Sequence, residues 1–91
     1  MEPKLADILR RESSNQLLKD IEWLPEEVAK DIRNCGRFII ICDTHIHEIS
    51  KTRSSIPYKY DHAVREWARS QGFNVYSKCN SYGVKQIVIE L

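Results

Sequence analysis

The sequence contains no apolar run near the roughly 18 residues that a membrane-spanning helix needs. It also shows no apolar stretch behind a basic N-terminal segment, which is the pattern of a secretory signal peptide. We therefore expect a folded protein of the cytoplasm with no membrane association.

Cysteines are few and widely spaced, at positions 35, 42 and 79, with no Cys-x-x-Cys pair. This spacing fits neither a disulfide framework nor a zinc ribbon and predicts reduced, mainly buried thiols. The chain also lacks a Gly-x-x-x-x-Gly-Lys loop, a nucleophile–base pair, a carboxylate dyad and a complete set of metal ligands. We therefore expect a non-catalytic protein without a cofactor or a small-molecule substrate.

The composition is that of an ordinary globular domain, with 91 residues, 42% hydrophobic and 30% charged. A chain of this length forms one domain with a modest core, which self-association would extend. We predict a single domain over residues 1–91, with a helical front over 1–35 and a β-α-β-β core over 36–91.

The longest apolar stretch, Phe38 to Cys42, predicts a central strand within the segment Arg37–His47. Side chains alternate along a strand, so Phe38, Ile40 and Cys42 are expected on one face. The same alternation, continued beyond the apolar run, predicts Asp43, His45 and His47 together on the other face. Whether these three polar residues form a site is the first functional question that the sequence raises.

The remaining elements follow from periodicity and from residues that end helices. Apolar spacing predicts a helix over 3–21, either as one bent helix or with a break at Ser14 or Asn15. A second helix begins at Pro25 and runs to about Asn34, with Gly36 as the residue that ends it, and a third covers 60–71. Strands are expected over 73–79 and 84–91, joined by a four-residue turn. The predicted fold is α+β, with a three-stranded sheet, the element order α-α-β-α-β-β and helices on one face.

The segment Asp43-Thr44-His45-Ile46-His47 resembles the Asp-Thr-His-x-His motif at the end of the first strand in TatD-type and amidohydrolase enzymes. That resemblance implies a divalent metal held by the two histidines. Those enzymes are barrels of about 200–250 residues with further ligands on later strands, which this chain lacks. Metal binding through Asp43, His45 and His47 is therefore a distant alternative, and no metal site is assigned.

Positive charge gathers in the C-terminal half of the chain. Residues 1–36 hold six Lys or Arg against eight Asp or Glu, whereas residues 48–91 hold seven against four. Basic residues mixed with tyrosines are typical of a surface that binds single-stranded nucleic acid. The alternative is an ordinary solvated surface with tyrosines at the edge of the core. The candidate nucleic-acid-binding residues are Lys51, Arg53, Arg65, Arg69, Tyr76, Lys78 and Lys85.

The stretch from Ile56 to Gly72, with the hairpin that follows, is similar to the small Arg-xxx-His domain, a family that binds single-stranded nucleic acid. The matching helix positions hold Asp61 or His62 and then Arg65, so the defining pair is absent and the resemblance implies only the helix–hairpin frame. The whole arrangement also resembles small accessory domains of tailed phages and large DNA viruses.

The two front helices carry more apolar residues than a three-stranded sheet needs for its cover. The surplus predicts an interface with another protein or with a second copy of the chain, as in a homodimer. Protein–protein interaction is therefore the first functional hypothesis, and nucleic-acid binding is the second. The candidate interface residues are Leu5, Ile8, Leu9, Leu17, Trp23 and Leu24.

Overall fold

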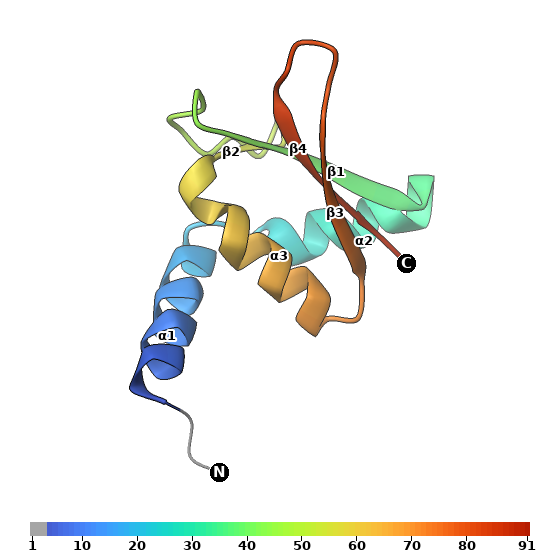
Figure 1. Cartoon of the computed structure of the whole chain (residues 1–91). Helices are drawn as coiled ribbons and strands as arrows, with labels where there is room; N and C mark the ends of the chain where they lie inside the picture. Colours follow the sequence, from blue (N-terminus) through green and yellow to red (C-terminus); the bar gives the residue numbers. More distant parts are fainter. Residues whose placement is uncertain (1–3) are drawn as a thin grey trace.

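A computed structural model describes residues 4–91 and shows three α-helices and a four-stranded sheet (Figure 1). In chain order the elements are α1 (Leu5–Lys19), α2 (Leu24–Cys35), β1 (Arg37–Asp43), β2 (Ser55–Pro57), a 3-10 turn (Tyr58–Tyr60), α3 (Asp61–Ser70), β3 (Asn74–Cys79) and β4 (Lys85–Glu90). The predicted α+β class is confirmed. No helix within residues 4–91 is both long and apolar enough to cross a membrane.

The strand order is β2-β1-β4-β3, with β1 and β4 in the centre. Strand β1 pairs with β2 in parallel and with β4 in antiparallel orientation, and β3 pairs with β4 in antiparallel orientation. The prediction of three strands and of the order α-α-β-α-β-β is therefore wrong by one element, β2. This strand has only three residues and ends in Pro57, and a proline argues against a strand because it cannot donate a ladder hydrogen bond.

The core lies between the sheet and helices α2 and α3. Strand β1 contributes Phe38, Ile40 and Cys42, all at most 1% exposed, as the alternation predicts. Leu24 of α2 and Val64 of α3 are equally buried against this face. Figure 1 shows the helices on one side of the sheet, which matches the predicted one-sided cover.

Helices α1 and α2 differ in how they meet this core. Helix α2 has Pro25 in its first turn and ends at Gly36, whose φ of 80° is the left-handed conformation that glycine adopts most readily. Helix α1 is continuous, so the alternative with a break at Ser14 or Asn15 is wrong. The predicted start of this helix at residue 3 lies outside the described residues. Helix α1 contains no fully buried residue, and its N-terminal end projects away from the sheet (Figure 1).

Candidate functional site

The sheet face opposite the helices is the candidate functional site. The strand registers place Tyr76, Val88 and Ile39 in one row across β3, β4 and β1. A second row holds Lys78, Gln86 and Ile41. Residues directly opposite one another in antiparallel strands share a face, and these rows alternate with the residues that pack on the helices. We call the surface formed by the two rows the helix-free face.

The helix-free face combines an apolar centre with an aromatic and basic margin. Val88 is fully buried yet lies outside the core between sheet and helices, and Ile39 and Ile41 are partly buried. Tyr76 is 43% exposed, and Lys78 lies two residues further along the same strand. The tyrosine therefore offers a ring for stacking and the lysine a cation on the same surface, which is the chemistry that single-stranded nucleic acid requires.

The other predicted nucleic-acid-binding residues lie elsewhere. Lys51 and Arg53 are exposed in the loop between β1 and β2, and the Lys51 Nζ lies 3.7 Å from the Glu27 carboxylate of α2. Arg69 is exposed on α3, with its guanidinium 3.5 Å from Glu66. The seven candidate residues therefore do not share one surface, because the sheet separates Tyr76 and Lys78 from the basic residues of the helix side.

Arg65 and Lys85 both pair with one buried carboxylate. Asp61, at the start of α3, is 3% exposed, and its Oδ2 accepts a hydrogen bond of 2.5 Å from Arg65. Its Oδ1 accepts no hydrogen bond from the described residues but lies 3.5 Å from the Lys85 Nζ. An aspartate this deeply buried is stable when cations surround it, so both basic residues balance charge inside the molecule.

Tyr58 completes this charged cluster on the helix side of the sheet. The Lys85 Nζ lies 4.7 Å from the centre of the Tyr58 ring and donates a hydrogen bond of 3.5 Å to its hydroxyl. Burial acts to lower the pKa of Lys85, but the Asp61 carboxylate and Tyr58 outweigh it, so the pKa is raised. Lys85 therefore stays protonated and anchored. The burial of the Asp61 carboxylate could not be predicted from the sequence, because its position resembled that of a solvent-exposed helix start.

The segment after β1 does not form the expected row of ligands. The strand ends at Asp43, and the chain then turns, with the Ile46 N–H donating to the Asp43 carbonyl. Asp43 instead holds the backbone, since Oδ1 accepts the His45 N–H at 3.0 Å and Oδ2 accepts the Lys85 N–H at 3.1 Å. The bond from the His45 N–H, followed by that from Lys85, lowers the pKa of this carboxylate.

The prediction that Asp43, His45 and His47 share a strand face is therefore wrong, because the strand stops before the two histidines, which are exposed. Within residues 4–91 no three His, Cys, Asp or Glu side chains come together in a way that could hold a metal ion.

The cysteines differ in environment. Cys42 is fully buried, and its Sγ donates to the Pro57 carbonyl at 3.5 Å. Burial, followed by the nearby Asp61 charge, raises the pKa of this thiol to about 12. Cys42 is therefore a core residue that stays protonated. Cys35 and Cys79 are exposed free thiols, so the expectation that they are buried is wrong.

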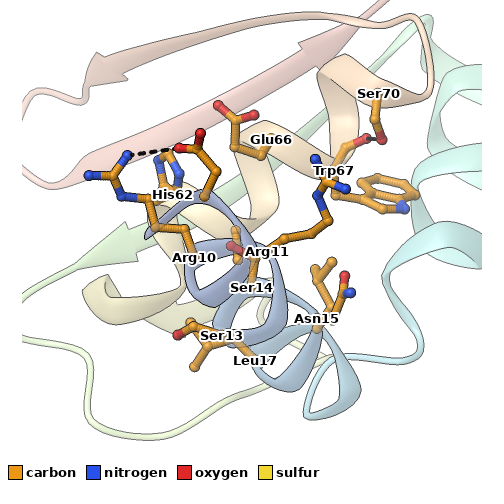
Figure 2. A pocket seen from close by; sticks show the side chains of 13 residues that line it. Arg10, Arg11, Ser13, Ser14, Asn15, Leu17, His62, Glu66, Trp67 and Ser70 are labelled. Atoms are coloured by element: carbon orange, nitrogen blue, oxygen red, sulfur yellow. Dashed lines mark hydrogen bonds and ion pairs between the residues drawn. The ribbon is translucent and has the colours of Figure 1, made fainter. Parts of the chain in front are cut away.

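A broad groove of about 990 Å³ separates α1 from α3 (Figure 2). Polar side chains of α1 line it, including Arg10 and Arg11, and α3 contributes His62, Glu66 and Trp67. Arg10 pairs with Asp7 of its own helix at 3.5 Å, and Figure 2 shows Arg11 extending toward Trp67. The groove is open, and its charges are of both signs, so it does not select an anionic or a cationic ligand.

The predicted protein interface divides into two groups. Leu24 is 1% exposed and belongs to the core, and Leu17 and Trp23 pack partly against it. These three residues therefore contribute to the core, because they lie where the chain turns from α1 into α2. Leu5, Ile8 and Leu9 remain exposed, at 69%, 37% and 54%. They are absent from the lining of the α1–α3 groove, so they form a stripe on the outer side of α1.

The comparisons with known proteins leave the family open. No protein-family model, no curated protein and no solved structure matches this chain. Function must therefore be inferred from the surfaces described above.

Proposed function

We propose that this protein is a non-catalytic module that binds single-stranded nucleic acid on its helix-free face. The observation that supports this proposal is the exposed Tyr76 ring beside Lys78, on the only sheet face without helices among residues 4–91. Base–aromatic stacking contributes about 1–3 kcal/mol per base, and a lysine supplies a phosphate contact. Gln86, opposite Lys78, adds an amide that can hydrogen-bond to a base edge.

The shape of the surface favours a single strand over a duplex. Ile39 and Ile41, which are only partly buried, can contact unstacked bases, whereas a duplex presents mainly phosphates to a protein surface. The net charge of the whole chain is only +1, so binding through phosphate contacts alone would be weak. Stacking on Tyr76 therefore has to supply a large share of the affinity.

Fluorescence anisotropy with labelled single-stranded DNA and RNA oligonucleotides at low salt tests this function. We expect Tyr76→Ala to weaken binding at least fivefold, as the loss of one stacking contact does. Tyr58→Ala is the matched control, since Tyr58 is 44% exposed but lies on the helix side. If wild type shows no binding at low salt, or if both variants bind equally to wild type, the proposal is wrong.

A second candidate function is binding of a protein partner through α1. Leu5, Ile8 and Leu9 form an apolar stripe that the rest of the described chain does not cover. Such a stripe fits an apolar groove on another protein. The double variant Leu5→Gln with Leu9→Gln removes the stripe while leaving the core unchanged. We expect it to lose partners that wild type captures from the source cell, and equal capture by both proteins would contradict this function.

The exposed free thiols of Cys35 and Cys79 support a reducing compartment, in agreement with the cytoplasmic location that we propose.

A further inference from the structure

Strand β3 is an open edge of the sheet. It comprises six residues, Asn74–Cys79, with no proline, and within residues 4–91 it pairs only with β4. An edge strand of this length presents backbone donors and acceptors that another strand can use. The opposite edge differs, because β2 is short and Ser55 exchanges two backbone hydrogen bonds with Ser50 of its own loop. Of the two sheet edges, β3 is therefore the one available for pairing.

The directions of the backbone groups in β3 follow from neighbouring hydrogen bonds. Just beyond the two strands, the Asn80 N–H donates to the Val84 carbonyl, so the backbone N–H at position 80 is directed toward the β4 side of the hairpin. Lys85, the residue after Val84, directs its N–H toward β1, where Asp43 accepts it. Directions alternate along antiparallel strands, so Asn74, Tyr76 and Lys78 bond to β4. Val75, Ser77 and Cys79 therefore direct their N–H and C=O groups outward.

We propose that β3 pairs with β3 of a second copy of this chain, antiparallel, about a two-fold axis at Ser77. In this register Ser77 lies opposite the Ser77 of the second copy, and Val75 opposite Cys79. All three outward-facing residues of each strand then form hydrogen-bonded pairs. A register shifted by two residues pairs Phe73, whose N–H is already donated to the Ala68 carbonyl, and so satisfies fewer groups.

Side chains support the second copy as the occupant. In the same register Tyr76 lies opposite the Lys78 of the other copy, on the helix-free face. The two residues form a pair without backbone hydrogen bonds, and side chains approach each other most closely in pairs of this kind. A lysine over a tyrosine ring is a favourable cation–π contact, and the two-fold axis forms it twice. The two Lys78 side chains do not face each other, so this edge lysine does not oppose pairing.

The helix layer leaves room for the second copy. Ser77 and Cys79 point to the helix side of β3, yet both are exposed, so the helices do not cover these two positions of the edge. Because the two-fold axis is perpendicular to the sheet, both helix layers lie on one side. The result is a continuous eight-stranded sheet, with the two helix-free faces joined into one surface.

Sedimentation of wild type and Ser77→Pro tests the pairing. Proline at position 77 removes an outward N–H and leaves the β3–β4 ladder intact, as is tolerated on edge strands. We expect wild type to form dimers with a dissociation constant that Ser77→Pro raises about tenfold or more, since two intermolecular hydrogen bonds are lost per dimer. Ser77→Thr is the matched control and should dimerise like wild type. A wild type that is monomeric at every concentration, or equal dimerisation of all three proteins, would overturn the proposal.

Disulfide trapping tests the register and does not depend on the proline variant. In a background with Cys35→Ser and Cys79→Ser, the added change Ser77→Cys places two thiols across the axis, at a separation that a disulfide can bridge. Asn74→Cys is the control, because its two copies lie about 20 Å apart in this register. Oxidation should link the Ser77→Cys protein and leave the Asn74→Cys protein monomeric. If no disulfide forms at position 77, or if both proteins are linked equally, the proposed register of the two β3 strands is wrong.

These experiments contain no nucleic acid, so their failure would leave the proposed function standing. Loss of self-association in the Leu5→Gln, Leu9→Gln protein with retention in Ser77→Pro would assign the contact to α1 and overturn pairing through β3.

Discussion

At the scale of single residues, the strongest electrostatic feature is Asp61. Its carboxylate is nearly inaccessible to solvent and is balanced by Arg65 on its own helix and by Lys85 on β4. The cluster therefore fastens the start of α3 to the hairpin. Removing any one member of such a cluster is destabilising, because the remaining charges are left partly desolvated and unpaired.

The variant Asp61→Asn should lower the free energy of unfolding by about 2–3 kcal/mol, because it leaves two half-buried cations without a counter-ion. Urea denaturation measures this change. Glu66→Gln is the control, since it removes an exposed partner of Arg69 and should cost less than about 0.5 kcal/mol. Equal effects of the two changes would show that the buried cluster is no more important than a surface ion pair.

Thiol reactivity should distinguish the cysteines. The pKa of Cys42 is raised to about 12, so its thiolate is scarce at pH 8, and the side chain is also inaccessible. A thiol-reactive chromophore should therefore modify Cys35 and Cys79 in the folded protein, and Cys42 only after denaturant is added. Rapid reaction of all three thiols in the folded state would contradict the burial of Cys42.

At the scale of elements, the helices and strands that were predicted are those with a clear hydrophobic periodicity or with residues that mark where an element ends. Helix α2 was located by Pro25 and Gly36, and the β3–β4 hairpin by its turn. Strand β2 could not be predicted, because three residues that include a proline carry no periodic signal. Tyr76 and Lys78 were named as candidates, but the face that carries them was not located, since the pattern of one strand does not reveal which face the helices cover. Gln86 was missed as a site residue for the same reason.

Helix α1 has a smaller share of the core than α2, so truncating an exposed leucine of α1 should cost less stability than truncating the buried leucine at the start of α2. Leu9→Ala should change the free energy of unfolding by less than about 0.5 kcal/mol, since this side chain is exposed. Leu24→Ala, just after the turn from α1 into α2, should cost about 2–5 kcal/mol because it leaves a cavity. Chemical denaturation compares the two. A large loss for Leu9→Ala would show that α1 packs on the domain along its whole length.

At the scale of the whole molecule, the two sheet faces differ in what they expose. The helix side buries the core and pairs Arg65 and Lys85 with Asp61, whereas the opposite side keeps Tyr76 and Lys78 accessible. Under the proposed function, this division would let a chain with a net charge of +1 offer a binding surface. Pairing through β3 would join the two helix-free faces and place both tyrosines on one continuous surface, each beside the Lys78 of the other copy.

Salt dependence separates the two contacts expected on this face. Lys78→Ala should weaken oligonucleotide binding and reduce the slope of log affinity against log salt by about 0.7, the value for one phosphate contact to a single strand. Tyr76→Ala should weaken binding without changing the slope, because stacking releases no counter-ions. An unchanged slope in Lys78→Ala would place the phosphate contact on another residue.

The effect of oligonucleotide length on affinity tests whether the dimer binds one strand with both of its copies. A strand long enough to cross the two-fold axis should bind wild type more tightly than a short one, since its second contact is intramolecular. Ser77→Pro should retain the short-strand affinity and lose most of the gain with length, whereas Tyr76→Ala should lose affinity at both lengths. Anisotropy titrations with two lengths at one salt concentration measure both effects. The same gain with length in Ser77→Pro and in wild type would show that the two faces act independently.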